Sequence, residues 1–258
     1  TQLLNKQELS IRLDQLTKKN NIQSTHGFSL LFIDLDHFKK VNDTKGHLVG
    51  DKLLRQVAQR LKQAARLDDA IFRFGGDEFC VLLHNTNCRM TVSLVADRIL
   101  KSLEQIYIID QYKFRISASI GVALIDRHRV IASEIIRNAD IAMYEAKRLG
   151  RGQVAFYQAN MFQHLVYKQD IEDELADAIA NGELSLQLQP IHDNNHLKGF
   201  EALSRWHHPK KGMIFPDQFI AVAEETGLIH NLGKWLIDSA CAQLACWVKR
   251  YDINSCPY

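Results

Sequence analysis

The architecture follows from the segment Ile71-Phe72-Arg73-Phe74-Gly75-Gly76-Asp77-Glu78-Phe79-Cys80-Val81-Leu82-Leu83. Its two apolar halves, residues 71–74 and 79–83, have the aromatic and branched side chains that are common in strands. Gly75-Gly76 between them predicts a tight turn, because glycine adopts backbone conformations that other residues avoid. The segment therefore predicts an antiparallel β-hairpin that carries Asp77.

The sequence around this hairpin predicts alternating strands and helices. The apolar run at 29–33 is typical of a strand buried on both faces, and it ends in Asp34-Leu35-Asp36. The other expected elements are a helix at 49–64, a helix at 92–100, a strand at 114–124, a helix at 132–148 and a strand at 154–156. The order β-α-β-β-α-β with a central antiparallel hairpin predicts a ferredoxin-like α+β sandwich.

A second unit follows Tyr157. Its expected elements are a helix at 165–179 ended by Asn181-Gly182, short strands at 184–188 and 199–203, and helical periodicity over 219–251 broken near Gly227 and Gly233. We divide the chain into a first domain at 1–160, a connecting helix at 161–182 that begins the second unit, and the rest of that unit at 183–258.

Composition and charge limit the class of function. Hydrophobic residues at 46% and charged residues at 24% are typical of globular domains and exclude a disordered or fibrous chain. The net charge of +2 is too small to suggest nucleic-acid binding. Residues 1–160 carry 24 basic and 17 acidic side chains, whereas residues 161–258 carry 8 and 13. This change of sign supports two units, and the basic first unit suits a polyanionic small molecule.

Other sequence features concern the cellular location. No apolar run reaches the ~18–20 residues of a membrane span, and the chain begins at Thr1 without a basic and apolar leader. The 5 cysteines have no metal-site or disulfide spacing and are expected to be reduced. We expect a fragment of a cytoplasmic protein, and an upstream membrane anchor in the parent protein stays open.

Two carboxylates are candidates for a metal site. Asp34 ends the first strand, and Asp77 lies in the hairpin that neighbours this strand in a ferredoxin-like sheet, so the two can converge. Burying two carboxylates at a sheet end is costly unless a cation compensates. A hard divalent metal that completes its shell with phosphate meets this need. The alternative is a pair of strand-end residues that cap a turn.

Two longer stretches can be compared with known families: Asp34-Leu-Asp-His-Phe-Lys-Lys-Val-Asn-Asp-Thr-Lys-Gly-His-Leu-Val-Gly-Asp51 and Arg73-Phe-Gly-Gly-Asp-Glu-Phe79. They resemble the GGDEF family of diguanylate cyclases, and the resemblance extends from Thr1 to about Tyr157. It implies that Mg²⁺ or Mn²⁺ is held by Asp34, the Leu35 carbonyl and Asp77. Asp77 and Glu78 would be the catalytic residues, with Glu78 assisting at the metal or at the attacking hydroxyl.

The resemblance also implies two sets of GTP contacts. Asn42 and Asp51 would bind guanine, because a carboxylate can accept hydrogen bonds from both N1–H and N2–H. The triphosphate would be held by backbone amides near Phe38 and by the cations Lys39, Lys147 and Arg151. The residues alone allow simpler roles: Asp51 as a helix-start residue, and Lys147 and Arg151 as basic side chains at a helix C-terminus.

The implied reaction is attack by the 3′-hydroxyl of one GTP on the α-phosphorus of another, with release of pyrophosphate and formation of cyclic di-GMP. Because one domain binds one GTP, the catalyst would be a homodimer. The alternative is a non-catalytic module that senses GTP or cyclic di-GMP and regulates a downstream phosphodiesterase. A further tetrapeptide, Arg66-Leu-Asp-Asp69, resembles the family's product-inhibition site. Arg66 and Asp69 would bind cyclic di-GMP there, or else form a helix-end salt bridge.

The second unit carries its own resemblance. The stretches concerned are Gln189-Pro-Ile, Glu201-Ala-Leu-Ser-Arg-Trp206, Pro216-Asp-Gln-Phe-Ile and Ala223-Glu-Glu-Thr-Gly-Leu-Ile229. They resemble the start of the EAL family of cyclic di-GMP phosphodiesterases. By position, Glu201 would ligate a metal, Arg205 would contact phosphate and Gln189 would line the pocket. A (β/α)8 barrel needs ~250 residues, so we expect an incomplete barrel segment that does not hydrolyse cyclic di-GMP.

Overall fold

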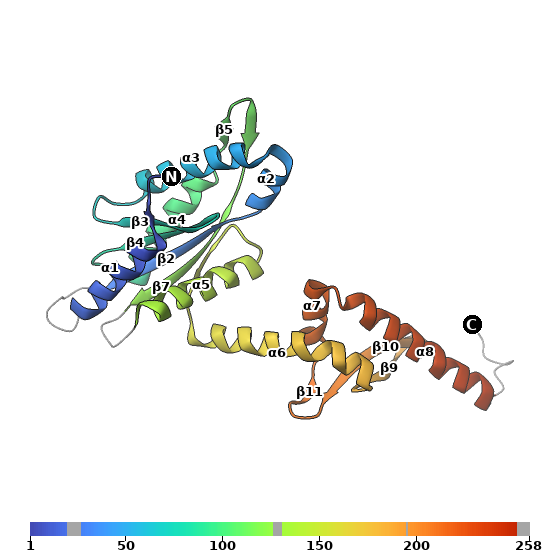
Figure 1. Cartoon of the computed structure of the whole chain (residues 1–258). Helices are drawn as coiled ribbons and strands as arrows, with labels where there is room; N and C mark the ends of the chain where they lie inside the picture. The colour runs from blue at the N-terminus through green and yellow to red at the C-terminus, as the bar shows by residue number, and fades with distance from the viewer. Residues whose placement is uncertain (20–26, 126–130, 195, 252–258) are drawn as a thin grey trace. The chain divides into compact units, whose positions relative to one another are not determined.

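A computed structural model describes residues 1–19, 27–125, 131–194 and 196–251 (Figure 1). The chain forms two compact units, Thr1–Phe162 and Gln163–Tyr258. The first unit contains β1 (Leu4–Asn5), α1 (Lys6–Lys19), β2 (Phe28–Leu35), α2 (Phe38–Lys45), α3 (His47–Ala64), β3 (Ala70–Gly75), β4 (Glu78–Leu83), α4 (Arg89–Leu103), β5 (Tyr107–Ile109), β6 (Tyr112–Phe114), β7 (Ala118–Ile125), α5 (Ala132–Arg148) and β8 (Val154–Phe156).

The first unit is built on a six-stranded mixed sheet with the strand order β1-β3-β4-β2-β7-β8. The four central strands β3, β4, β2 and β7 pair antiparallel, whereas β1 and β8 add parallel partners at the two edges. The central strands follow one another along the chain in the β-α-β-β-α-β order predicted from the sequence. The hairpin β3–β4 therefore lies directly beside β2.

Every residue of β2 is buried, because the sheet is covered on both faces. Leu31, Ile33 and Leu35 point into a core shared with α3 and α4, whereas Leu30 and Phe32 point into a second core with α1 and α5. Figure 1 shows these two pairs of helices on opposite sides of the sheet. This two-sided burial explains the uninterrupted apolar run of β2.

Two details of the first unit differ from the prediction. The expected strand at 114–124 is two strands, because Phe114 pairs with Tyr107 in a separate two-stranded sheet before β7 begins at Ala118. The apolar alternation continues through the break, so the sequence pattern does not reveal it. The hairpin turn is also displaced by one residue: Gly75 pairs with Glu78, so Gly76 and Asp77 form the turn. A register shift between Arg73 and Gly75 accounts for this displacement.

Helix α5 lies unusually close to the sheet. A Cβ atom at Gly121, in β7, would overlap the main chain of α5 at Ala139 and Met143. Only glycine permits this approach, which brings the helix backbone against the strand. The contact fixes the height of α5 above the sheet, and with it the position of the last turn of the helix.

The second unit contains most of α6 (Ala159–Asn181) together with β9 (Leu184–Asp193), β10 (His196–His208), β11 (Gly212–Ile214), α7 (Pro216–Thr226) and α8 (Ile229–Tyr251). Its antiparallel sheet has the order β11-β10-β9. The two main strands are longer than expected. The predicted break at Gly227 is confirmed, but the break at Gly233 is wrong, because α8 continues through it. A single glycine costs a helix only ~1 kcal/mol. The incomplete barrel segment stays a prediction.

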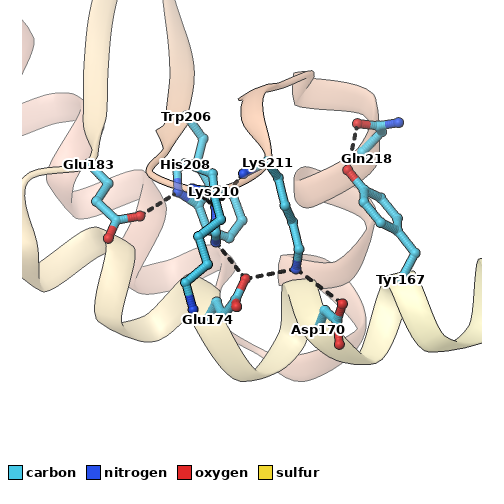
Figure 2. Close-up of polar contacts among 9 residues, drawn as sticks. All are labelled: Tyr167, Asp170, Glu174, Glu183, Trp206, His208, Lys210, Lys211 and Gln218. Atoms are coloured by element: carbon cyan, nitrogen blue, oxygen red, sulfur yellow. Dashed lines mark hydrogen bonds and ion pairs between the residues drawn. The ribbon is translucent and has the colours of Figure 1, made fainter.

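A closed polar network joins α6 to the end of β10 (Figure 2). His208 is 6% exposed, and its Nε2 lies 2.7 Å from the Glu174 carboxylate. Its Nδ1 accepts hydrogen bonds from the main-chain N–H groups of Lys210 and Lys211, both at 3.0 Å. The Lys211 ammonium in turn contacts Glu174 and Asp170. The side chains of His208, Glu174, Lys211 and Asp170 are thus linked to one another by hydrogen bonds and ion pairs.

Within the described residues, no helix combines the length and apolar character needed to span a membrane. The described cysteines Cys80, Cys88, Cys241 and Cys246 are free thiols. Cys256 lies outside the described residues.

Candidate active site

The end of β2 and the turn of the β3–β4 hairpin meet at one edge of the sheet. Asp34 is paired in register with Glu78, and the Leu35 N–H donates a hydrogen bond to the Asp77 carbonyl at 3.4 Å. The Arg73 guanidinium donates two exposed hydrogen bonds to the Gly76 carbonyl, at 3.1 and 2.8 Å, and so stabilises the turn. The expected convergence of Asp34 with the hairpin is confirmed.

Asp34 is a buried carboxylate with a cationic partner. It is 8% exposed, and the Nζ atom of Lys147, from the last turn of α5, lies 2.8 Å from its Oδ1. Burial raises the pKa of Asp34 above its ordinary value although Lys147 lowers it, and the charges of Asp77 and Asp36 raise it further. Lys147 therefore offsets only part of the cost of this charge.

Glu78 adds to the excess of negative charge at this edge. Burial raises the pKa of Glu78, and the charges of Asp34, Asp140 and Asp77 raise it further, while Lys147 opposes them. Across the described ranges no three His, Cys, Asp or Glu side chains form a ready metal cluster. The paired carboxylates and the main-chain oxygens beside them nevertheless fit a hard divalent cation whose shell is completed by phosphate.

The backbone beyond β2 prepares the phosphate side of the site. His37 has the left-handed conformation, with φ of 60°, and α2 begins directly after it at Phe38. The first N–H groups of a helix have no intrahelical partner, and they carry the positive end of the helix dipole. Phe38 is buried, whereas the Lys39 side chain is exposed next to these N–H groups. The arrangement suits an anion.

The guanine candidates lie on α2 and α3. The Asn42 side-chain oxygen is buried without a hydrogen-bond partner, and a Cβ atom at Gly50 would overlap it. A buried acceptor without a donor is costly, so this oxygen is suited to a ligand that brings an N–H group. Asp51 is exposed, and the first turn of α3 contains no acidic residue. The simpler role of Asp51 as a first-turn residue is therefore wrong.

The loop after α5 contains Arg151, which is exposed and has φ of 63°. Its N–H donates to the Ala146 carbonyl at 3.1 Å, and the next N–H, of Gly152, donates to the Asp36 carboxylate at 3.1 Å. Asp36 also accepts hydrogen bonds from Ser117 and Ser119. The sequence analysis placed Asp36 at the strand end without a role, because its three donors lie 81, 83 and 116 residues away from it in the chain.

Arg66 and Asp69 form a turn between α3 and β3. The Asp69 carboxylate accepts a hydrogen bond from the main-chain N–H of Arg66 at 2.8 Å, and the Asp69 N–H donates to the Arg66 carbonyl at 3.1 Å. Arg66 is exposed. These two hydrogen bonds involve the main chain of Arg66 and not its guanidinium.

Gln189, Glu201 and Arg205 lie in a different setting, on the β9–β10 hairpin of the second unit. Gln189 and Glu201 are paired across the two strands, and both are exposed. Arg205 is paired with Ser185 and donates to the carbonyl of its own neighbour, Ser204. The hairpin aligns these residues, but among the described residues no three His, Cys, Asp or Glu side chains gather there into a group that could hold a metal.

Residues 1–153 match the model of the diguanylate cyclase GGDEF domain. The chain belongs to the GGDEF family. In addition, residues 172–256 match the EAL domain. A GGDEF domain followed by part of an EAL domain is therefore confirmed.

Relatives of this GGDEF chain include larger signalling proteins. The bifunctional diguanylate cyclase/cyclic di-GMP phosphodiesterase MucR of Pseudomonas aeruginosa is 40% identical over 250 residues, which cover 96% of this chain and 36% of MucR. The cyclic di-GMP phosphodiesterase PdeR of Escherichia coli is 40% identical over 219 residues, 84% of this chain and 33% of PdeR. The chain thus spans about a third of the length of these curated relatives.

Solved GGDEF structures have the same fold. The GGDEF domain of YfiN (or TpbB) from Pseudomonas aeruginosa is 34% identical with a TM-score of 0.61, covering 64% of this chain and 96% of that one. The GGDEF domain of DgcB from Caulobacter crescentus, solved in complex with c-di-GMP, is 26% identical with a TM-score of 0.56, covering 60% and 89%. These likenesses support the mixed α/β cyclase fold of the first unit.

Proposed function

We propose that the GGDEF domain is a diguanylate cyclase that condenses two GTP molecules into cyclic di-GMP and releases pyrophosphate. The observation that carries the proposal is the carboxylate edge, where Asp34, Asp77 and Glu78 gather beside Lys147. This edge retains an excess of negative charge that a structural turn does not require. Membership of the GGDEF family supports the same function.

In the proposed reaction, the 3′-hydroxyl oxygen of one GTP forms a bond to the α-phosphorus of the other while the bond from that phosphorus to pyrophosphate breaks. The reciprocal attack closes the ring and releases a second pyrophosphate. Bound Mg²⁺ or Mn²⁺ would activate that hydroxyl and neutralise the leaving pyrophosphate. Asp34, the Leu35 carbonyl and Asp77 would hold the metal. Glu78 would assist at the metal or accept the hydroxyl proton, and its raised pKa supports the second role because it makes the carboxylate a better base.

The substrate contacts follow from the same edge. Asn42 and Asp51 would bind guanine, and the unpartnered Asn42 oxygen supports this role. Lys39 and the first N–H groups of α2 would hold the triphosphate together with Lys147 and Arg151. Lys147 would then exchange Asp34 for a phosphate oxygen when a metal binds the carboxylate. Because each domain offers one guanine set, two copies must face each other, and we infer a homodimer as the catalyst.

The test is incubation of the chain with GTP and Mg²⁺, followed by chromatography for cyclic di-GMP. Product whose rate rises more steeply than the protein concentration supports a dimeric cyclase. GTP binding without product would instead favour the second candidate, a non-catalytic sensing module. That candidate has one specific support, since the relative PdeR is named as a phosphodiesterase at 40% identity. Absence of both binding and turnover would contradict both functions.

We infer a product-binding role for Arg66 and Asp69. The turn fixes the Asp69 carboxylate against the Arg66 backbone, so the exposed guanidinium is available to a phosphate or a guanine edge. Arg66→Ala should leave the initial rate unchanged and allow the reaction to proceed beyond the product concentration at which the wild type stops. Lys62→Ala, on the last turn of α3, is the control. Progress curves that flatten at the same product concentration would assign Arg66 to the turn alone.

For the partial EAL domain we propose no hydrolysis within this chain. Glu201 and Gln189 are exposed on one hairpin, and the carboxylates that would complete a metal shell there are not brought to them by the described elements. Incubation with cyclic di-GMP and Mn²⁺ should give no linear product, whereas hydrolysis that Glu201→Gln abolishes would overturn this inference.

A further inference from the structure

A buried carboxylate beside the site, Asp36, has no part in the proposed chemistry. Asp36 is 2% exposed, and its carboxylate accepts hydrogen bonds from Ser117 Oγ at 2.7 Å, Ser119 Oγ at 2.8 Å and the Gly152 N–H at 3.1 Å. Its own N–H donates to the Ser117 carbonyl at 3.0 Å. Three of these contacts fasten Asp36 to the start of β7. The fourth reaches the loop after α5, which is 116 residues away in the chain.

That loop has an unfavourable backbone conformation. Gly150, Arg151 and Gly152 have φ of 118°, 63° and 57°, which is the left-handed region. Glycine tolerates this region, whereas the Cβ atom of an arginine disfavours it. Such a conformation persists only where its surroundings enforce it. Two hydrogen bonds do so here: Arg151 N–H to the Ala146 carbonyl, within the helix end, and Gly152 N–H to Asp36.

We propose that Asp36 is a positioning residue that holds the loop 149–153, and thereby the Arg151 side chain, in the conformation that receives the GTP triphosphate. The inference rests on the proposed function, because it assigns Asp36 to the triphosphate side of that site. Asp36 does not touch the substrate in this role. It fixes the loop to the end of β2, where Asp34 also lies. The proposed metal ligand Asp34 and the proposed phosphate ligand Arg151 are therefore positioned by the same strand end.

A purely structural role for Asp36 has a different consequence. If the carboxylate only joins β2 to β7 through the two serines, its loss lowers stability and leaves the loop unaffected. Ser119→Ala is the matched control for that case, since it removes one donor from the sheet side of the same carboxylate and leaves the Gly152 contact in place. The two roles therefore separate when affinity and stability are measured on the same variants.

The experiment is titration calorimetry of the full chain with GTP, and with inorganic tripolyphosphate as a probe that lacks the base. Asp36→Ala and Arg151→Ala should each weaken tripolyphosphate binding about tenfold, the equivalent of ~1.4 kcal/mol. The double variant should be no weaker than Arg151→Ala, because Asp36 acts through Arg151. Ser119→Ala should bind like the wild type, and Asp36→Asn, which keeps an oxygen for Gly152, should restore most of the affinity.

The possible outcomes distinguish failure of the inference about Asp36 from failure of the proposed cyclase function. Wild-type protein that binds neither GTP nor tripolyphosphate overturns both. If the wild type binds normally, two results overturn the inference alone. One is an additive loss of affinity in the double variant, and the other is a loss of affinity in Ser119→Ala equal to that in Asp36→Ala. If Asp36→Ala does not fold, Asp36→Ser replaces it, because its hydroxyl is one bond too short to reach Gly152 yet still lies beside the two serines. Retention of wild-type affinity in Asp36→Ser then counts against the inference.

Discussion

The carboxylate edge of the first unit and the polar network of the second unit both combine acids with a lysine, yet their charges are balanced differently. At the edge, burial raises the pKa of Asp34 and Glu78, and Lys147 is the cation that opposes this. In the network, hydrogen bonds from Lys211 and His208 lower the pKa of Glu174 (Figure 2). The network is satisfied by the protein itself, whereas the edge is left with charge for a ligand to neutralise. This difference distinguishes a candidate site from a structural cluster.

The EAL residues on the hairpin β9–β10 can be compared in the same way with the GGDEF residues. Glu201 and Gln189, which the EAL resemblance assigns to a metal and a pocket, are paired across β9 and β10, but they are exposed and come from one hairpin. The GGDEF residues come instead from β2, the β3–β4 turn and α5, which converge from distant parts of the chain. A sequence motif identifies the residues of a candidate site. Packing between separate elements then buries these residues, and the burial shifts their pKa values.

The largest expected effect comes from removing a carboxylate at the edge. Asp77→Ala should lower the rate of cyclic di-GMP formation at least a hundredfold, as losing a charged transition-state contact does, while the circular dichroism spectrum stays unchanged. The turn position of Asp77 makes this separation of activity from folding feasible. Glu201→Ala, a carboxylate on the exposed hairpin, should leave the cyclase rate intact. Activity of Asp77→Ala within tenfold of wild type would remove the distinction between the two regions.

The next effect concerns the choice of base. Asp51→Ala should weaken GTP binding by roughly 2–4 kcal/mol, since it deletes two contacts to the guanine edge, at least one of them charge-assisted. ATP offers no N1–H or N2–H donors, so its affinity should stay unchanged and the preference for GTP should be lost. Asp43→Ala, an exposed carboxylate on α2, is the control. A preserved ratio of GTP to ATP affinity would show that Asp51 does not bind the base.

A third test separates the two proposed partners of Lys147. Lys147→Met should strengthen Mn²⁺ binding in the absence of nucleotide, because the ammonium no longer competes for Asp34, and should weaken GTP binding about tenfold. Arg148→Met is the control, since Arg148 pairs with Glu145 instead. Mn²⁺ binding can be followed by electron paramagnetic resonance. Weaker Mn²⁺ binding in the variant would mean that Lys147 supports the metal site and does not compete for it.

The smallest effect tests the opposite pKa directions of the two regions. Because the pKa of Glu78 is raised, ionisation costs stability as the pH rises, so Glu78→Gln should gain ~0.5 kcal/mol at neutral pH and nothing in acid. Because the pKa of Glu174 is lowered, the stability that its ionised form contributes is lost as the pH falls, so Glu174→Gln should lose stability at neutral pH.

All 3 tryptophans, Trp206, Trp235 and Trp247, lie in the second unit. Their fluorescence therefore reports Glu174→Gln, and circular dichroism reports both variants. Changes of the same sign would contradict the comparison.

The sequence predicted the central hairpin and its neighbour β2 because both depend on local apolar patterns and on glycine. It did not predict the one-residue displacement of the turn, since a register shift inside a strand leaves those patterns unchanged. Asp36 was seen but given no function, because its partners Ser117, Ser119 and Gly152 approach it only in the folded sheet. His208 was likewise hidden, since its burial depends on α6, whose Glu174 lies 34 residues earlier in the chain.

Gly121 has a consequence for how activity is inferred from sequences of this kind. Any larger residue there would lift α5 from β7, and the displacement would carry the Lys147 ammonium away from Asp34. The Gly-Gly-Asp-Glu-Phe stretch at 75–79 would be untouched by such a substitution. A homologous chain can therefore keep every residue of the family motif and still lack cyclase activity, because the spacing between α5 and β7 is set by a residue outside that motif. The residue at position 121 should therefore be included when active and inactive GGDEF sequences are compared.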